Sequence, residues 1–214
     1  MLTVLCFFSL FTFSRIARAG EWVFDFEDPK QADRWKAANG SGKIQKGVYA
    51  EISATEKAAH TLFGEADWTD YTVEAKIRID ANRWASLVFR AVSEYEYYIV
   101  YPEPTPGVSA FFQHHGKDWA TRAQPNPNKT QIKGKIQVGN WCHLKIEVKR
   151  NDLKWFIDDP LQAETKLERV GDLDVYKKVR LASGLGRQKR ALTTLKFMGL
   201  ISKGKSLSLR RSWR

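Results

Sequence analysis

Residues 71–80 read YTVEAKIRID, and their side chains alternate between apolar and polar without a break. A period of two over these ten residues predicts a β-strand with one buried and one solvent-facing side, as in antiparallel sheets. Residues 142–150, which read CHLKIEVKR, repeat the alternation. They predict a second half-buried strand of the same kind.

Five more stretches are expected to form strands, at residues 84–92, 95–101, 108–115, 153–157 and 179–185. The first three are apolar or aromatic at successive positions, so both of their sides need cover or a ligand. Turn-forming Gly, Pro, Asn and Asp residues separate the stretches, and no helical period of useful length interrupts them. The expected fold class is therefore all-β, a sandwich of two antiparallel sheets.

Charge is distributed unevenly along the 214 residues. The net charge is +11, but residues 1–19 and 187–214 hold all of the excess and no Asp or Glu, and the body between them has 24 basic and 24 acidic residues. A nucleic-acid-binding face would make the folded body positive, so no nucleic-acid partner is expected. The hydrophobic fraction of 43% excludes general disorder and fits one domain.

The first residues resemble an export signal. Residues 2–13 are an apolar run too short to span a bilayer comfortably, and the A-x-A cleavage pattern Ala17-Arg18-Ala19 follows. Residues 1–19 are expected to be a signal peptide and residues 20–186 the folded domain, secreted or periplasmic and without a membrane span. A membrane-anchored start is the alternative. Cleavage would leave Cys142 as the single thiol, expected to be a small buried hydrophobe.

A ligand groove is expected on the concave face of the sandwich. If Leu87 and Phe89 enter the core, alternation turns Arg90 toward that groove. Taking Ile99 and Phe112 as core residues in the same way turns Tyr98, Gln113 and His115 toward the groove. Trp84 and Trp119, at strand or loop ends, would flank it. Aromatic rings stack on sugars, and Arg or Gln donors match hydroxyls or a carboxylate. The predicted carbohydrate contacts are Arg90, Tyr98, Gln113, His115, Trp119 and Trp84; the alternative is that these side chains only pack.

Four stretches resemble strand motifs of concanavalin A-like lectin/glucanase domains. They are WTDYTVEA (68–75), LVFRA (87–91) followed by Tyr97-Tyr98, GNWCHLK (139–145) and WFIDD (155–159). Within that superfamily the chain is similar to the laminin-G-like and 3-keto-disaccharide-hydrolase-like groups, over roughly residues 21 to 186. The resemblance implies a jelly-roll sandwich. It is more specific for fold than for function.

The resemblance implies three functions. The first is a secreted carbohydrate-binding domain, and the second is a glycoside hydrolase of the 3-keto-disaccharide type. The third is a laminin-G-like domain that binds a protein. The E-x-D-x-x-E motif of family-16 glucanases does not occur, and Glu94 and Glu96 are expected in a solvated loop or strand edge. Catalytic residues and the oligomeric state are therefore not assigned.

No metal or cofactor is expected. His114 and His115 are adjacent on a predicted strand, so they point to opposite faces and cannot share a metal. Similar sandwiches often hold a structural Ca²⁺ with N-terminal carboxylates, here Asp25, Glu27 and Asp28, together with a C-terminal Asp. That C-terminal partner is missing, which makes calcium the less favoured alternative.

Similar sandwiches usually close with a strand such as A-x-F-D-D-V-x-V, but here residues 187–214 form a basic tail. Read in a shifted codon frame, residues 191–199 can encode F-D-D-V. One hypothesis is therefore that the tail is an out-of-frame replacement of the last strand. The alternative is a genuine disordered tail that binds anionic polymers or surfaces.

Overall fold

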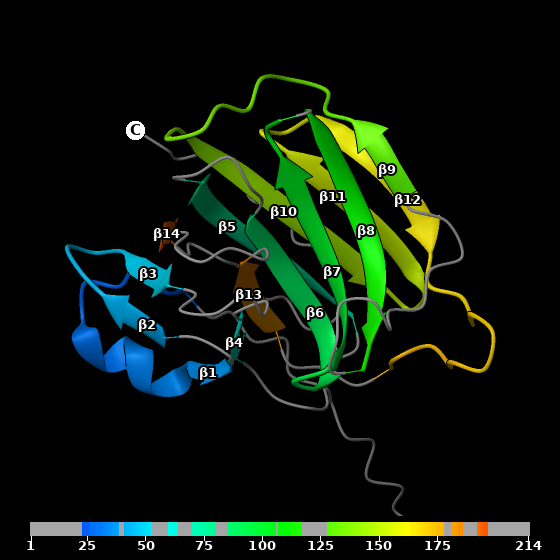
Figure 1. Cartoon of the computed structure of the whole chain (residues 1–214), viewed down its shortest axis with the longest axis horizontal. Helices are drawn as coiled ribbons and strands as arrows, with labels where there is room; N and C mark the ends of the chain where they lie inside the picture. Colours follow the sequence, from blue (N-terminus) through cyan, green and yellow to red (C-terminus); the bar gives the residue numbers. More distant parts are fainter. Residues whose placement is uncertain are drawn as a thin grey trace, which may run out of the picture.

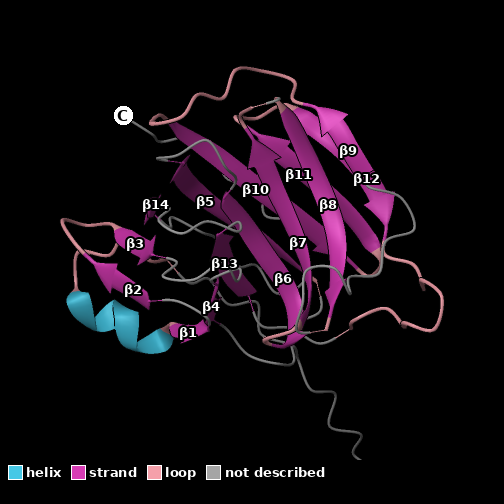
Figure 2. Cartoon of the chain, viewed as in Figure 1, coloured by secondary structure: helices cyan, strands magenta, loops and turns pink. Residues whose placement is uncertain are grey.

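The computed structural model describes residues 23–38, 41–52, 60–63, 70–79, 85–105, 107–116, 128–177, 181–185 and 192–196. Within these ranges the chain forms two antiparallel sheets packed face to face, with one short 3-10 helix, η1 (Pro29–Arg34), beside them (Figures 1 and 2). The predicted all-β sandwich of two antiparallel sheets is confirmed.

Each sheet has seven strands. Sheet A has the spatial order β1 (Lys36–Ala38), β4 (His60–Phe63), β13 (Leu181–Leu185), β6 (Ala85–Ser93), β7 (Glu96–Glu103), β8 (Val108–His115), β9 (Asn128–Gln131). Sheet B has the order β12 (Leu161–Lys166), β11 (Asp152–Ile157), β10 (Trp141–Lys149), β5 (Tyr71–Ile79), β14 (Leu192–Lys196), β3 (Tyr49–Ile52), β2 (Ser41–Ile44). In Figure 1, β6 to β9 lie in front of β10 to β12.

Sheet B has one buried and one outward side, as the alternating sequences predicted. Along β5 and β10 every second residue is buried, and the register sets Ala75 opposite Leu144 and Val73 opposite Ile146. These side chains meet those of sheet A in the main core. The indole Nε1 of Trp155 crosses this core and donates a hydrogen bond to Ser109 Oγ at 3.1 Å, which satisfies a buried polar group.

Sheet A is apolar on both sides. Leu87, Phe89 and Val100 face sheet B in the main core. Their neighbours along the strands form a second buried cluster on the opposite side, which we call the outer face of sheet A: Leu62, Val88, Ala91, Tyr97, Ile99, Tyr101, Ala110, Phe112. Both sides of the three central stretches were expected to need cover or a ligand, and each side forms a buried cluster.

Two turns set the register of the central strands. Between β7 and β8, Gly107 has a φ of +82°, which favours glycine, and its N–H donates to Glu103 O at 3.0 Å. The resulting register pairs Glu96 with His115. Between β6 and β7, Ser93 pairs with Glu96 and Phe89 with Tyr98, so residues 90–92 bulge opposite the single residue Tyr97.

The tail contributes to the fold. Residues Leu192–Lys196 form β14, which pairs with β5 on one side and with β3 on the other. The predicted domain boundary at residue 186 lies between β13 and β14. The predicted signal peptide lies outside the described residues. No helix in the described part of the chain is long and apolar enough to cross a membrane.

Candidate functional site

The structure turns two of the predicted groove residues toward the core. Tyr98 pairs with Phe89 on one neighbouring strand and with Gln113 on the other. Directly opposed residues in a sheet point to the same face, and Phe89 lies in the main core. Tyr98 and Gln113 therefore face sheet B, and the predicted orientation of β7 and β8 was wrong. Because both sides of these strands are apolar, alternation alone could not select the face.

Arg90 also lies inside the protein. It has a φ of +49° within the β6 bulge, and only 2% of its surface is exposed. Its backbone N–H donates to Tyr71 Oη at 3.2 Å. Its guanidinium donates to two carbonyl oxygens, from Nη1 to that of Tyr176 at 3.2 Å and from Nη2 to that of Arg150. With Leu87 and Phe89 in the main core, alternation along β6 predicts that Arg90 lies on the outer face of sheet A. The bulge turns it inward instead.

Tyr176 is the residue around which four of the six predicted contacts gather. Its N–H donates to Tyr98 Oη at 3.2 Å, and its carbonyl oxygen accepts from Arg90. Two residues earlier, Asp174 O accepts from Gln113 Nε2 at 3.2 Å. We call the assembly the Tyr176 cluster; its members are Arg90, Glu96, Tyr98, Gln113, His115 and Tyr176. Trp84 and Trp119 lie outside the described residues.

The accessible part of the Tyr176 cluster is formed by a carboxylate, an imidazole and a phenol. His115 Nδ1 lies 3.2 Å from Glu96 Oε1 and 3.3 Å from Tyr176 Oη. The side chains of His115 and Glu96 are 39% and 37% exposed, so solvent reaches them. Ser93 Oγ donates to the second carboxylate oxygen of Glu96 at 3.2 Å. The Tyr98 and Tyr176 rings, 5.2 Å apart, lie behind this group.

Both tyrosines of the cluster are protonated at neutral pH. Burial raises the pKa of Tyr176 to about 12, although a hydrogen bond with Gln113 opposes the shift. Burial likewise raises the pKa of Tyr98. The Tyr176 phenol therefore donates a hydrogen bond, to His114 O at 3.1 Å in this structure. Glu96 supplies acceptor oxygens, and a ring nitrogen of His115 can either donate or accept a hydrogen bond. The group can therefore bind hydroxyls through both donors and acceptors.

Sequence reasoning missed Glu96 and Tyr176. The sequence predicts a solvated loop or strand edge for Glu96, and the register of the hairpin closed at Gly107 places it opposite His115. A hairpin register extended back from that turn would have found it. Tyr176 lies in residues 167–177, which contain no strand and only an isolated bridge between Val170 and Leu173. No pattern in the sequence marks it.

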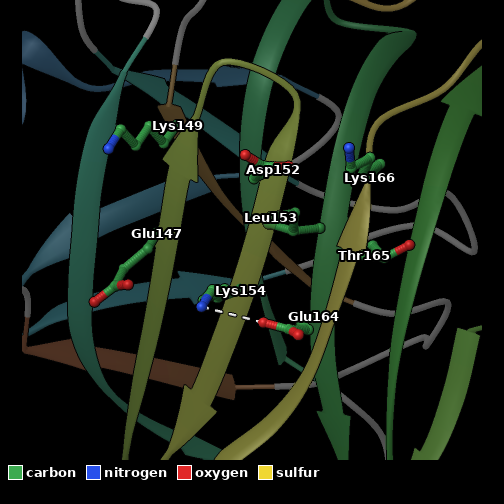
Figure 3. A pocket seen from close by; sticks show the side chains of 8 residues that line it. All are labelled: Glu147, Lys149, Asp152, Leu153, Lys154, Glu164, Thr165 and Lys166. Carbon is green, nitrogen blue, oxygen red and sulfur yellow. Dashed lines mark ion pairs between the residues drawn. The ribbon is translucent and has the colours of Figure 1, made fainter.

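A hollow on the outside of sheet B is a weaker candidate (Figure 3). It has a volume of about 640 Å³ and is lined by Glu147, Lys149, Asp152, Leu153, Lys154, Glu164, Thr165 and Lys166. Lys154 Nζ and Glu164 Oε2 form an ion pair at 3.1 Å across it. Its basic and acidic side chains are equal in number and it contains no aromatic ring, so it lacks the stacking surface that a sugar needs.

The N-terminal carboxylates make hydrogen bonds within the chain. Asp25 Oδ1 accepts from Glu27 N and Gln31 Nε2, and Asp28 Oδ1 accepts from Lys30 N at the start of η1. Over the described ranges, no group of three or more His, Cys, Asp or Glu side chains could hold a metal ion. His114 and His115 lie on opposite sides of β8, as predicted. The His114 ring stacks on Tyr97, whereas His115 contacts Glu96.

The sequence of this chain matches a known protein family. The family model described as a 3-keto-alpha-glucoside-1,2-lyase-like domain matches residues 21–175. This chain belongs to that family. The match covers η1 and the strands from β1 to β12, including all cluster residues on β6, β7 and β8. It ends one residue before Tyr176. The resemblance to the 3-keto-disaccharide-hydrolase-like group is confirmed.

Solved structures share the jelly-roll sandwich. The carbohydrate-binding module CBM66 from Bacillus subtilis is 16% identical, with 80% of this chain and 96% of that chain covered at a TM-score of 0.62. The endo-beta-1,3-glucanase from Pyrococcus furiosus is 12% identical, with coverages of 86% and 94% and a TM-score of 0.60. The laminarinase from Rhodothermus marinus is 14% identical, with coverages of 89% and 100% and a TM-score of 0.58. No curated protein sequence matches the chain. These likenesses confirm the predicted fold.

Proposed function

We propose that the chain binds a carbohydrate and that the Tyr176 cluster contacts it. The observation that carries the proposal is the convergence of Glu96, His115 and Tyr176 at a solvent-accessible end of β7 and β8. Acceptor and donor atoms at this spacing match neighbouring sugar hydroxyls, and the half-buried Tyr176 ring supplies apolar surface. The family description and the carbohydrate-binding module and glucanases that share the fold support this ligand class.

The predicted contacts divide into two roles under this proposal. His115 meets the ligand directly, together with Glu96 and Tyr176. Arg90, Tyr98 and Gln113 are buried and act through the main chain around Tyr176. Trp84 and Trp119 remain proposed contacts on the basis of the sequence alone.

A second candidate function is the elimination reaction in the family's description. In a 3-keto-α-glucoside the C3 carbonyl acidifies the hydrogen on C2. A base removes that proton, the electron pair forms a C1–C2 double bond, and the C1–O bond breaks as the leaving oxygen takes up a proton. The pairing of His115 with Glu96 favours His115 as the base, and the protonated Tyr176 phenol can hydrogen-bond the carbonyl oxygen.

A glycan array with the full chain tests binding. We expect His115→Ala and Glu96→Gln to lose signal for any glycan that the unchanged protein selects. His143→Ala is the matched control, because His143 Nε2 and Glu74 Oε2 lie the same 3.2 Å apart on the outside of sheet B. Equal signal from all three variants would contradict the proposed site. A blank array from folded protein would favour the laminin-G-like, protein-binding alternative.

Turnover of a 3-keto-α-glucoside separates the two carbohydrate functions. The lyase function predicts release of the C1 substituent by the unchanged protein and by His143→Ala, and loss of that release in His115→Ala. Binding without release would leave a carbohydrate-binding domain.

We also propose export of the chain, based on residues 2–13 and Ala17-Arg18-Ala19. N-terminal sequencing of the exported protein should then begin at Gly20.

A further inference from the structure

The Tyr176 segment is held in place from sheet A at several points. Residues 167–177, which we call the Tyr176 segment, contain no strand, so hydrogen bonds between strands do not hold their backbone in place. The N–H of Tyr176 is bound by Tyr98 and its carbonyl oxygen by Arg90, while its phenol reaches His114 O. A residue held at its N–H, its C=O and its side chain has little freedom to move.

Arg90 connects two segments that are distant in sequence. Its two terminal nitrogens bind the carbonyl oxygens of Tyr176 and of Arg150, which lies in the turn between β10 and β11. A guanidinium holds several donors in one rigid plane, whereas a lysine ammonium is a single point. Burying a charge is unfavourable unless its hydrogen bonds are satisfied. The side chain therefore suits a position that must hold two carbonyls at once.

Tyr98 binds the same residue from a second strand. Its hydroxyl accepts the Tyr176 N–H, and its ring lies 5.5 Å from Phe89 and 5.2 Å from Tyr176. Ring packing and hydrogen bonding are thus separable, because Tyr98→Phe would keep the first and remove the second.

We infer that Arg90 and Tyr98 are positioning residues that hold Tyr176 against His115 and so complete the binding site. The inference rests on the proposed function of the Tyr176 cluster. It explains why Arg90, at a positive φ in the β6 bulge, and Tyr98, in the core, both form hydrogen bonds with the main chain of Tyr176, which lies outside the sheets. The side chains themselves need not meet the ligand.

Amide hydrogen exchange of the full chain tests the positioning without any ligand. Removing one net hydrogen bond should raise the exchange rate of the Tyr176 amide about fivefold to tenfold in Tyr98→Phe. Arg90→Lys should raise it as well, while the amides of β10 keep their protection. Tyr95→Phe is the control, because Tyr95 is not a member of the cluster. Unchanged protection at Tyr176 in both variants would overturn the inference.

Glycan affinity of the same variants connects the positioning to the site. For a glycan that the unchanged protein binds, we expect weaker binding by Tyr98→Phe at an unchanged urea midpoint. Full affinity together with lost protection at Tyr176 would overturn the inference. If the unchanged protein binds no glycan, the proposed function fails separately, and amide exchange still decides whether Arg90 and Tyr98 hold Tyr176.

Discussion

The rings of Tyr97 and His114 stack on the outer face of sheet A, with centroids 4.5 Å apart and planes 3° from parallel. The two residues are direct partners across β7 and β8, and both are buried. Because the next residue on each strand points the other way, this contact explains why Tyr98 and His115 belong to the opposite side. The outer face therefore carries packed aromatic rings.

Truncating Tyr97 should destabilise the domain strongly. Tyr97→Ala removes a buried ring that contacts His114 and His60, and loss of a buried aromatic side chain costs about 3–5 kcal/mol. Urea unfolding followed by fluorescence measures the change. Tyr95→Ala, two residues away and less buried, should leave the midpoint near that of the unchanged protein. Similar midpoints for the two variants would show that the outer face does not contribute to stability.

Asp70 should stabilise the turn between β10 and β11. Its Oδ1 accepts a hydrogen bond of 2.6 Å from the N–H of Arg150, a residue with a φ of +51°. We expect Asp70→Ala to lower the free energy of unfolding by about 1 kcal/mol, the usual net value of such a bond. The exposed Asp172 offers a matched control, and Asp172→Ala should have little effect. A thermal melt in which both variants match the parent would count against this role for Asp70.

The Cys142 thiol should be inert in the folded protein. Burial, with a contribution from the Asp158 carboxylate, raises the pKa of Cys142 to about 12. Below its ordinary pKa of 9.0 both states keep the proton, so the thiol does not change stability there. Between pH 9.0 and about 12 the unfolded chain releases the proton first, and stability falls by up to about 1.4 kcal/mol per pH unit.

Two measurements check this behaviour of Cys142. Alkylation at pH 8, followed by peptide mapping, should modify Cys142 only after urea is added. Cys142→Ala should flatten part of the decline in stability above pH 9. Rapid alkylation of Cys142 in native buffer would contradict the prediction.

The ion pair in the hollow of Figure 3 should add little to stability. Lys154 and Glu164 are exposed, and such pairs lose most of their attraction to solvent screening. We expect Lys154→Ala to leave both the urea midpoint and any glycan signal unchanged. A glycan signal that disappears in Lys154→Ala but persists in His115→Ala would move the binding site to sheet B.

Part of the Tyr176 cluster could be predicted from the sequence. Arg90, Tyr98, Gln113 and His115 were selected for chemistry and strand position, and the structure brings them together. The predicted orientation of Tyr98, Gln113 and His115 was wrong because β7 and β8 are apolar on both sides, whereas the β6 bulge turns Arg90 inward. The turn at Glu94-Tyr95 could have given the correct orientation. It pairs Ser93 with Glu96, which puts Phe89 and Tyr98 on the same side of the sheet. The bulge does not change this result, because it shifts the register by an even number of residues.

The amino-acid sequence by itself determined the half-buried strands β5 and β10, since alternation along a strand is a local property that needs no partner. β1 to β4, β9, β12 and β14 lie outside the predicted stretches. β5 and β8 follow their predicted ranges closely, and sheet B faces as expected. Only the tertiary structure decided which side of β7 and β8 meets the core and which carbonyls Arg90 binds. Those choices depend on strand register and on contacts such as Arg90 to Tyr176, between residues 86 positions apart, which no local pattern encodes.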